Sequence, residues 1–253
     1  MVIQLQPFDH IKKRLPGRRR RALWPIFVAV AGTTGALGAL ARAHPSATAQ
    51  TFREDFSSGN LDAWQLPHPE DWEILSEGPL HYLHMKRSRE PGVPRRPLQF
   101  ALANIGPFGS FKLEAHVRRV GRSMIVVFGY VDTLHFYYAH LSVDRGTEDS
   151  VHNGVFIVNG GPRKRIAGLE AAPALPDRAW HTVRVARDTS SGRIQVFMDG
   201  QKQALFSVED RTFACGRVGI GSFDETGDFA DIRIVAHGLG CTPASGEQPG
   251  PAE

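Results

Sequence analysis

The clearest pattern along the chain is a recurring short run in which apolar and polar positions alternate. Residues 111–118 are the best example, with Phe111, Leu113, Ala115 and Val117 apolar and polar residues between them. This alternation is typical of a strand with one buried face, because successive side chains of a strand point to opposite sides. Further strand-like runs are predicted at 125–130, 135–142, 155–159, 163–167, 180–187, 194–198, 217–223 and 229–235.

Turn residues separate these runs, and no stretch of helical length after residue 50 has the 3.6-residue period of an amphipathic helix. Many short strands joined by frequent turns predict one all-β domain over residues 50–236. We expect a two-sheet antiparallel sandwich of the jelly-roll type. Residues 237–253 are rich in Gly and Pro and are predicted to form a disordered tail.

Residues 1–49 have the organisation of a secretory signal peptide. Basic residues precede an apolar stretch over 22–41, and Ala47-Thr48-Ala49 supplies the small residues that signal peptidase reads. Cleavage after Ala49 is predicted, and an uncleaved membrane anchor is the alternative, because about 20 apolar residues are long enough to span a bilayer. We therefore expect an exported protein, secreted, periplasmic or at the cell surface, with no membrane association once the signal is removed.

The charge distribution argues against a nucleic-acid partner. The leader holds 8 of the 30 Lys and Arg residues and one of the 26 Asp and Glu residues, so residues 50–253 carry a net charge of −3. That balance offers no electrostatic surface for a phosphate backbone. Gly219 and Gly221 lack the third glycine and the helix of a dinucleotide fingerprint, and no organic cofactor is expected.

Cys215 and Cys241 are the two cysteines of the chain. They flank the runs 217–223 and 229–235, and a hairpin formed by these runs would bring both to its open end. A disulfide is predicted, since export makes one possible; two buried free thiols are the alternative.

Six short motifs carry a resemblance to a known family. They are Asp55-Phe56 with Leu61 and Trp64, Trp72 to Ile74, Gly78 with Leu80, Trp180 to Val185, Val196 to Gly200, and Gly216 to Gly221. Together they resemble LamG-like, concanavalin A-like jelly-roll domains. The chain is most similar to secreted 3-keto-disaccharide hydrolase-like, or family 16 glycoside hydrolase-like, domains, and the resemblance covers residues 51–236.

Strand alternation predicts which polar and aromatic side chains reach an open sheet face. One strand offers Glu114, His116 and Arg118, and another offers Phe136, Tyr138 and His140. If these lie on one face, they would suit a saccharide, because sugar C–H faces stack on aromatic rings while hydroxyls need donors and acceptors. The alternative is that the aromatic residues pack under a loop.

A second candidate segment follows that strand. The resemblance implies that His152 and Asn153 lie at the rim of the site. Arg163 and Arg165 are candidates for binding an anionic glycan, because a guanidinium binds carboxylate or sulfate bidentately. The alternative is a solvated strand edge that discourages strand addition.

Catalysis is harder to locate in this sequence. Glycoside hydrolysis usually needs two carboxylates, and the family 16 Glu-x-Asp-x-Glu signature is absent. Glu114 is the acid placed in mid-strand, and with His116 it is the candidate general acid or base.

The resemblance also implies one structural calcium between the first and last strands, where Glu54, Asp55 and Asp231 supply carboxylates. The alternative is that these acids pair with Arg53 and Arg233.

We therefore expect a secreted, monomeric domain that binds an oligo- or polysaccharide on an open sheet face. The alternatives are a glycoside hydrolase of the 3-keto-disaccharide type and an extracellular protein-interaction domain.

Overall fold

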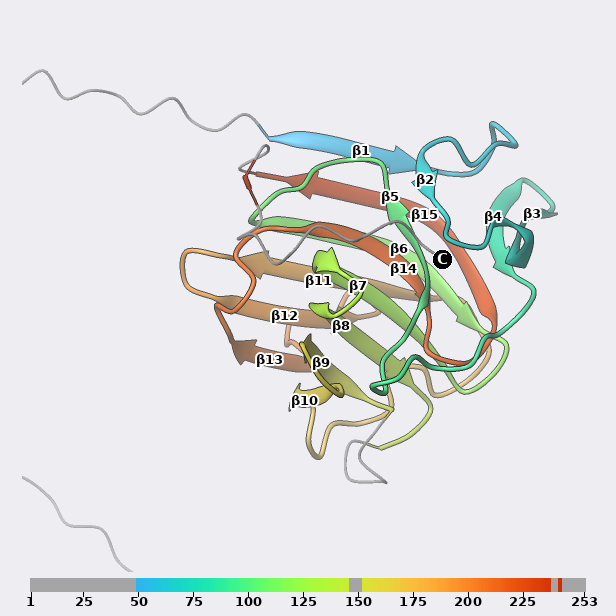
Figure 1. Cartoon of the computed structure of the whole chain (residues 1–253). Coiled ribbons are helices and arrows are strands. Elements are labelled where there is room, and N and C mark those ends of the chain that lie inside the picture. The colour runs from blue at the N-terminus through green and yellow to red at the C-terminus, as the bar shows by residue number, and fades with distance from the viewer. Residues whose placement is uncertain (1–48, 146–151, 238–240, 243–253) are drawn as a thin grey trace, which may run out of the picture. The chain divides into compact units, whose positions relative to one another are not determined.

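The computed structural model describes residues 49–145, 152–237 and 241–242, whose strands form two antiparallel sheets (Figure 1). Sheet A contains β1 Gln50–Glu54, β3 Trp72–Glu77, β4 Leu80–Met85, β6 Phe111–Arg119, β11 His181–Asp188, β12 Arg193–Met198, β13 Phe206–Glu209 and β15 Gly227–Ala236. Its order is β13-β12-β11-β6-β15-β4-β3, with β1 also paired to β15. In Figure 1, β1, β15, β6, β11, β12 and β13 lie side by side in this order.

Sheet B contains β2 Trp64–Gln65, β5 Gln99–Ala103, β7 Ser123–Asp132, β8 His135–Ser142, β9 Gly154–Asn159, β10 Lys164–Ala167 and β14 Arg217–Ser222. Its order is β10-β9-β8-β7-β14-β5-β2. Among the described residues the helical element is one 3-10 turn, η1 Pro69–Asp71. The predicted all-β, two-sheet jelly-roll sandwich is confirmed.

The core lies between the two sheets and follows the alternation of the strands. On β6 the four apolar residues Phe111, Leu113, Ala115 and Val117 are buried, while Lys112 and Glu114 are exposed. On β8 the residues Tyr137, Ala139 and Leu141 belong to the same buried cluster. Burying a Phe, Leu or Val side chain stabilises the fold by about 1.5–3 kcal/mol, and these contributions hold the two sheets together.

The two cysteines form a disulfide, although not through the predicted hairpin. Cys215 and Cys241 are bonded to each other. However, β14 pairs with β5 and β7 in sheet B, and β15 pairs with β1, β4 and β6 in sheet A. The expectation that these two strands form one hairpin is therefore wrong. The chain crosses from sheet B to sheet A between β14 and β15. It still returns to the end of the sandwich where Cys215 lies, so that Cys241 can reach it.

Two predictions about the ends of the chain fall largely outside the described residues. The signal peptide over 1–49 does so except for Ala49, and the tail over 237–253 does so except for residues 237, 241 and 242. In the part of the chain that the structure describes, no helix is long and apolar enough to cross a membrane.

His181, the first residue of β11, provides a test of how pH affects stability. Its Nδ1 lies 2.9 Å from Asp199 Oδ2 and its Nε2 lies 3.0 Å from Asp177 Oδ1. Burial lowers the pKa of His181, but the hydrogen bonds to Asp199 and Asp177 raise it, and the net direction is upward. The stabilisation from protonated His181 is therefore present below the unfolded-state pKa of about 6.5 and is lost as pH rises through the folded-state pKa.

We predict that His181→Gln destabilises the protein more at about pH 5.5 than at about pH 9, measured by urea unfolding at both values. His81→Gln is the matched control, because the side chain of His81 makes no hydrogen bond and no ion pair within 4.0 Å with the other described residues. Equal destabilisation by His181→Gln at the two pH values would contradict the prediction.

Candidate functional site

The residues predicted to share one open face lie on opposite faces of the sandwich. Glu114, His116 and Arg118 point outward from β6 in sheet A, whereas Phe136 and Tyr138 point outward from β8 in sheet B. The core between the sheets separates the two groups. The expected single site is therefore wrong, because alternation identifies the outward side chains of a strand without telling which sheet the strand joins.

The outer face of sheet B carries a row of aromatic residues that we call the aromatic floor. It consists of Phe136, Tyr138, Phe156, Phe223 and the ring of His140. Tyr138 and Phe156 stack with ring centroids 5.1 Å apart, and His140 stacks on Phe223 at 5.6 Å. Phe136, Tyr138 and His140 are nevertheless fully buried, so the expectation that they line an open surface is not met.

Arg163 and the β4–β5 connection cover the aromatic floor. The guanidinium carbon of Arg163 lies 4.0 Å from the centroid of Phe223, and Arg95 in the connection lies 4.8 Å from the same ring. The backbone amide of Arg163 donates to the carbonyl of Arg95 at 3.0 Å. Arg96 Nε donates to the carbonyl of Thr133, which fixes the connection to the β7–β8 turn. The loop-covered arrangement, which was the alternative expectation, is the observed one.

The polar contacts of Arg163 indicate which ring nitrogen of His140 carries the proton. Its Nη1 donates to the Tyr138 hydroxyl at 3.0 Å and to His140 Nδ1 at 3.3 Å. Because Nδ1 accepts, the proton of His140 is assigned to Nε2, which donates to Ser123 Oγ at 2.9 Å. Burial, and then the charge of Arg163, hold the pKa of His140 well below its usual value. Arg163 Nη2 is buried without a hydrogen-bond partner among the described residues.

The remaining predicted residues of this region differ in accessibility. His152 is partly exposed, and its Nδ1 lies 3.0 Å from Asp144 Oδ2. Asn153 is fully buried and donates from Nδ2 to the carbonyl of Ala172, so it is a structural residue and not the rim residue that we expected. Arg165 is opposite Phe156 in register and therefore shares the outer face of sheet B.

An open pocket lies on the same outer face of sheet B, and the sequence did not predict it. Its volume is about 460 Å³. Apolar and aromatic groups of β5, β7 and their neighbours form one part of its lining, and polar groups surround them: Gln65, Pro67, His68, Leu98, Phe100, Leu102, Tyr130, Val131, Asp132, Thr133 and Arg217. We call this the Tyr130 pocket.

Tyr130 reaches this pocket because of a bulge in β7. Simple alternation places Tyr130 on the side of Val126 and Phe128, which face the core. Gly129 has a φ of 57°, and the β7–β8 register shifts between Phe128 and Asp132. This left-handed backbone conformation is accessible to glycine and turns Tyr130 to the outer face. Its ring meets Phe100 edge to face with centroids 5.4 Å apart.

The polar groups of the Tyr130 pocket differ in their hydrogen bonding within the protein. The Tyr130 hydroxyl makes no hydrogen bond with the other described residues, and burial raises its pKa, so it is a protonated donor at neutral pH. Arg217 is held by hydrogen bonds to Gln65 and to the carbonyl of Ala103. Asp132 accepts from His135 Nδ1 at 2.8 Å and from the amide of Leu134, which orients its carboxylate.

The outer face of sheet A carries a separate polar network. Arg118 Nε donates to Asp228 Oδ2 at 2.7 Å, and Asp228 Oδ1 lies 2.7 Å from His84 Nδ1. The guanidinium of Arg118 also packs on Tyr82 and Trp180. Arg118 is therefore committed within the protein. Glu114 is exposed and makes no ion pair with the described residues.

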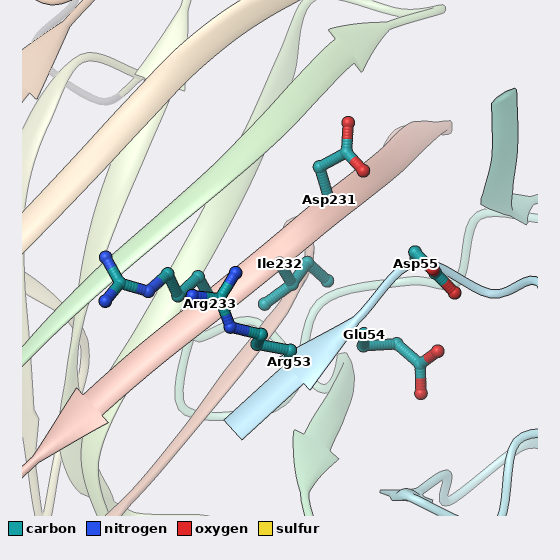
Figure 2. Close-up of a pocket in the computed structure, with 6 residues that line it drawn as sticks. All are labelled: Arg53, Glu54, Asp55, Asp231, Ile232 and Arg233. Atoms are coloured by element: carbon teal, nitrogen blue, oxygen red, sulfur yellow. The ribbon is translucent and has the colours of Figure 1, made fainter. Parts of the chain in front are cut away.

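The predicted calcium ligands are neighbours without forming a metal site. Glu54, Asp55 and Asp231 line one pocket because β1 pairs with β15, as their placement on the first and last strands predicted. Figure 2 shows the Asp231 carboxylate directed away from those of Glu54 and Asp55. Within the described residues, no group of three or more His, Cys, Asp or Glu side chains is placed to hold a metal ion. These three residues therefore do not fit a calcium site.

Comparisons with known proteins identify the fold. No protein-family model matches the sequence, and no curated protein matches it. Winged bean acidic lectin, solved with methyl-alpha-D-galactose, is 12% identical with a TM-score of 0.53, covering 75% of this chain and 99% of the lectin. A mutant of the GH43 protein BlXynB from Bacillus licheniformis is 16% identical with a TM-score of 0.53, covering 73% of this chain and 39% of that one. The carbohydrate-binding module CBM66 from Bacillus subtilis is 14% identical with a TM-score of 0.47, covering 69% and 96%.

The fold is thus a concanavalin A-like jelly roll, as the sequence motifs indicated. The finer resemblance to 3-keto-disaccharide hydrolase-like domains has no family match behind it and stays a prediction.

Replacing Arg163 tests how the aromatic floor is covered. We predict that Arg163→Met destabilises the protein by about 1–3 kcal/mol, because it removes a cation–π contact and two hydrogen bonds. The pKa of His140 should rise, since the positive charge that opposes its protonation is gone. Chemical unfolding and an NMR titration of His140 measure the two effects. Lys164→Met, at the exposed neighbouring position, should change neither quantity.

Proposed function

We propose that this protein is an exported carbohydrate-binding jelly-roll domain that holds a saccharide in the Tyr130 pocket. The observation that carries the proposal is the pairing of Tyr130 and Phe100 with a ring of polar groups in one open pocket. Sugars bind through this combination, because their C–H faces stack on aromatic rings and their hydroxyls need fixed donors and acceptors. Solved jelly-roll structures with the same fold include a lectin bound to a galactoside.

The aromatic residues continue from the Tyr130 pocket along sheet B. Tyr130 lies 5.8 Å from Phe136 between centroids, and Phe136 lies 6.1 Å from Tyr138. His152, Arg163 and Arg165 are further along this face, and we propose them as secondary contacts for a longer saccharide.

Export is supported by the covalent structure. The Cys215–Cys241 disulfide is a bond that persists in oxidising compartments, and the leader has the pattern of a secretory signal. Both features support the proposal that the sugar is bound outside the cytoplasm.

Binding is the activity that the pocket geometry favours. Glycoside hydrolysis usually uses two carboxylates on either side of the scissile bond. Asp132 is the carboxylate that the described lining of the Tyr130 pocket contains, and its oxygens already accept hydrogen bonds from His135 and Leu134. Glu114 and His116, proposed from the sequence as general acid or base, lie on the other outer face.

The test is a screen of the exported chain against a glycan array that includes 3-keto-disaccharides, followed by calorimetry and product analysis. We predict that Tyr130→Ala weakens the affinity for the best ligand roughly tenfold to a hundredfold, because it removes a contact of about 1.5–3 kcal/mol. Tyr130→Phe removes only a hydroxyl that has no described partner, so it should leave stability unchanged and weaken binding less.

Phe197→Ala is the matched control, since Phe197 is an outward aromatic residue of β12 in sheet A. It should leave glycan affinity unchanged. Equal affinity of Tyr130→Ala and the unmodified protein would refute the placement of the site, and release of products from a bound glycan would replace the binding role with a hydrolytic one.

A further inference from the structure

Two arginines face each other across the first and last strands of sheet A. The register of β1 and β15 places Arg53 directly opposite Arg233. Both side chains are exposed on the outer face, where like charges at directly opposite positions of an antiparallel pair destabilise the sheet. Neither guanidinium makes an ion pair with a described residue. The expected alternative, in which these arginines pair with Glu54, Asp55 and Asp231, is therefore not what the structure contains.

The neighbouring carboxylates are committed to other partners. Glu54 Oε1 accepts from the amide of Phe56 at 2.8 Å. Asp55 Oδ1 accepts from the amide and the hydroxyl of Ser57. Asp231 Oδ2 lies 3.0 Å from His116 Nδ1. Each acid is thus oriented by a contact that does not involve Arg53 or Arg233.

Glu114 is the remaining acid that faces this pair. Glu114 is on β6, and its register partners are Arg233 of β15 on one side and Arg184 of β11 on the other. No ion pair within 4.0 Å joins it to either among the described residues. Among the described residues, neither Arg53 nor Arg233 is therefore held in an ion pair, although Glu114 and three further carboxylates lie near them.

The two arginines line a pocket of about 310 Å³. Figure 2 shows their side chains extending to one side of the pocket, while the carboxylates of Glu54 and Asp55 extend to the other. This arrangement divides the pocket into a cationic side and an acidic side. A guanidinium offers paired N–H donors that match the oxygens of sulfate, phosphate or carboxylate.

We propose that Arg53 and Arg233 form an oxyanion-binding site on the outer face of sheet A, in which one anionic group bridges both guanidiniums. The bound group supplies the missing counter-charge and removes the repulsion between the two strands. The site is on the opposite outer face from the Tyr130 pocket, and it does not depend on the proposed function.

The experiment uses sodium sulfate as the probe, with sodium chloride at equal ionic strength as the reference. Thermal unfolding of the unmodified protein should show a saturable increase in Tm with sulfate beyond that with chloride, because a ligand that binds the native state stabilises it. Arg53→Gln and Arg233→Gln should each weaken sulfate affinity by roughly tenfold or more.

Arg184→Gln is the matched control, because Arg184 lies further along the same row of sheet A. It should retain the sulfate response. Equal effects of sulfate and chloride, or an unchanged sulfate response in both Arg53→Gln and Arg233→Gln, would overturn the proposal.

A second arm identifies the source of the anionic group. A sulfated and a uronic oligosaccharide are compared with inorganic sulfate and phosphate by calorimetry. Tighter binding of one oligosaccharide, lost in Arg53→Gln and retained in Tyr130→Ala, assigns the anion to a glycan. Equal affinities for the oligosaccharides and the inorganic ions assign a free anion.

Discussion

Successive side chains of a strand point to opposite faces, and this protein fills the layer between its two sheets with the apolar alternates of both. Leu113 and Val117 from β6 meet this layer from sheet A, and Tyr137 and Leu141 from β8 meet it from sheet B. Because a strand has only two faces, burial of one set decides which residues reach the outside. Packed sheets lie about 10 Å apart, so no change of rotamer can bring outward groups of the two sheets together.

The two outer faces consequently have different chemistry. Sheet B carries aromatic rings that are covered at one end by Arg163 and open at the other in the Tyr130 pocket. The cover is a cation over aromatic faces, which supplies packing and hydrogen bonds to Tyr138 and His140 at once. The bulge at Gly129 turns the ring of Tyr130 outward, into the pocket at the open end of the row. One face thus combines a closed apolar floor with an accessible polar and aromatic pocket.

The outer face of sheet A carries charged residues among a few aromatic ones, and its arginines differ in their contacts. Arg118 is paired with Asp228 and packed between Tyr82 and Trp180, so its charge is neutralised within the fold. Arg53 and Arg233 face each other, and neither makes an ion pair with a described residue. The same residue type therefore has a structural role at one position and, in our proposal, binds an external anion at the other.

The sequence alone predicted the strands from β6 to β12, β14 and β15, because period-two alternation is a local property, whereas β1 to β5 and β13 were not predicted as strands. The run predicted at 135–142 is β8, and the outward direction of Glu114 and Tyr138 was also correct. The family resemblance implied that Glu54, Asp55 and Asp231 lie near one another, and the pairing of β1 with β15 brings them to one pocket. Only the tertiary structure decided which sheet each strand joins, that Arg163 and the β4–β5 connection cover the aromatic floor, and that a bulge turns Tyr130 outward. These features depend on contacts between residues far apart in the chain, or on the backbone conformation of one glycine. The alternation of apolar and polar residues along a strand predicts neither of them.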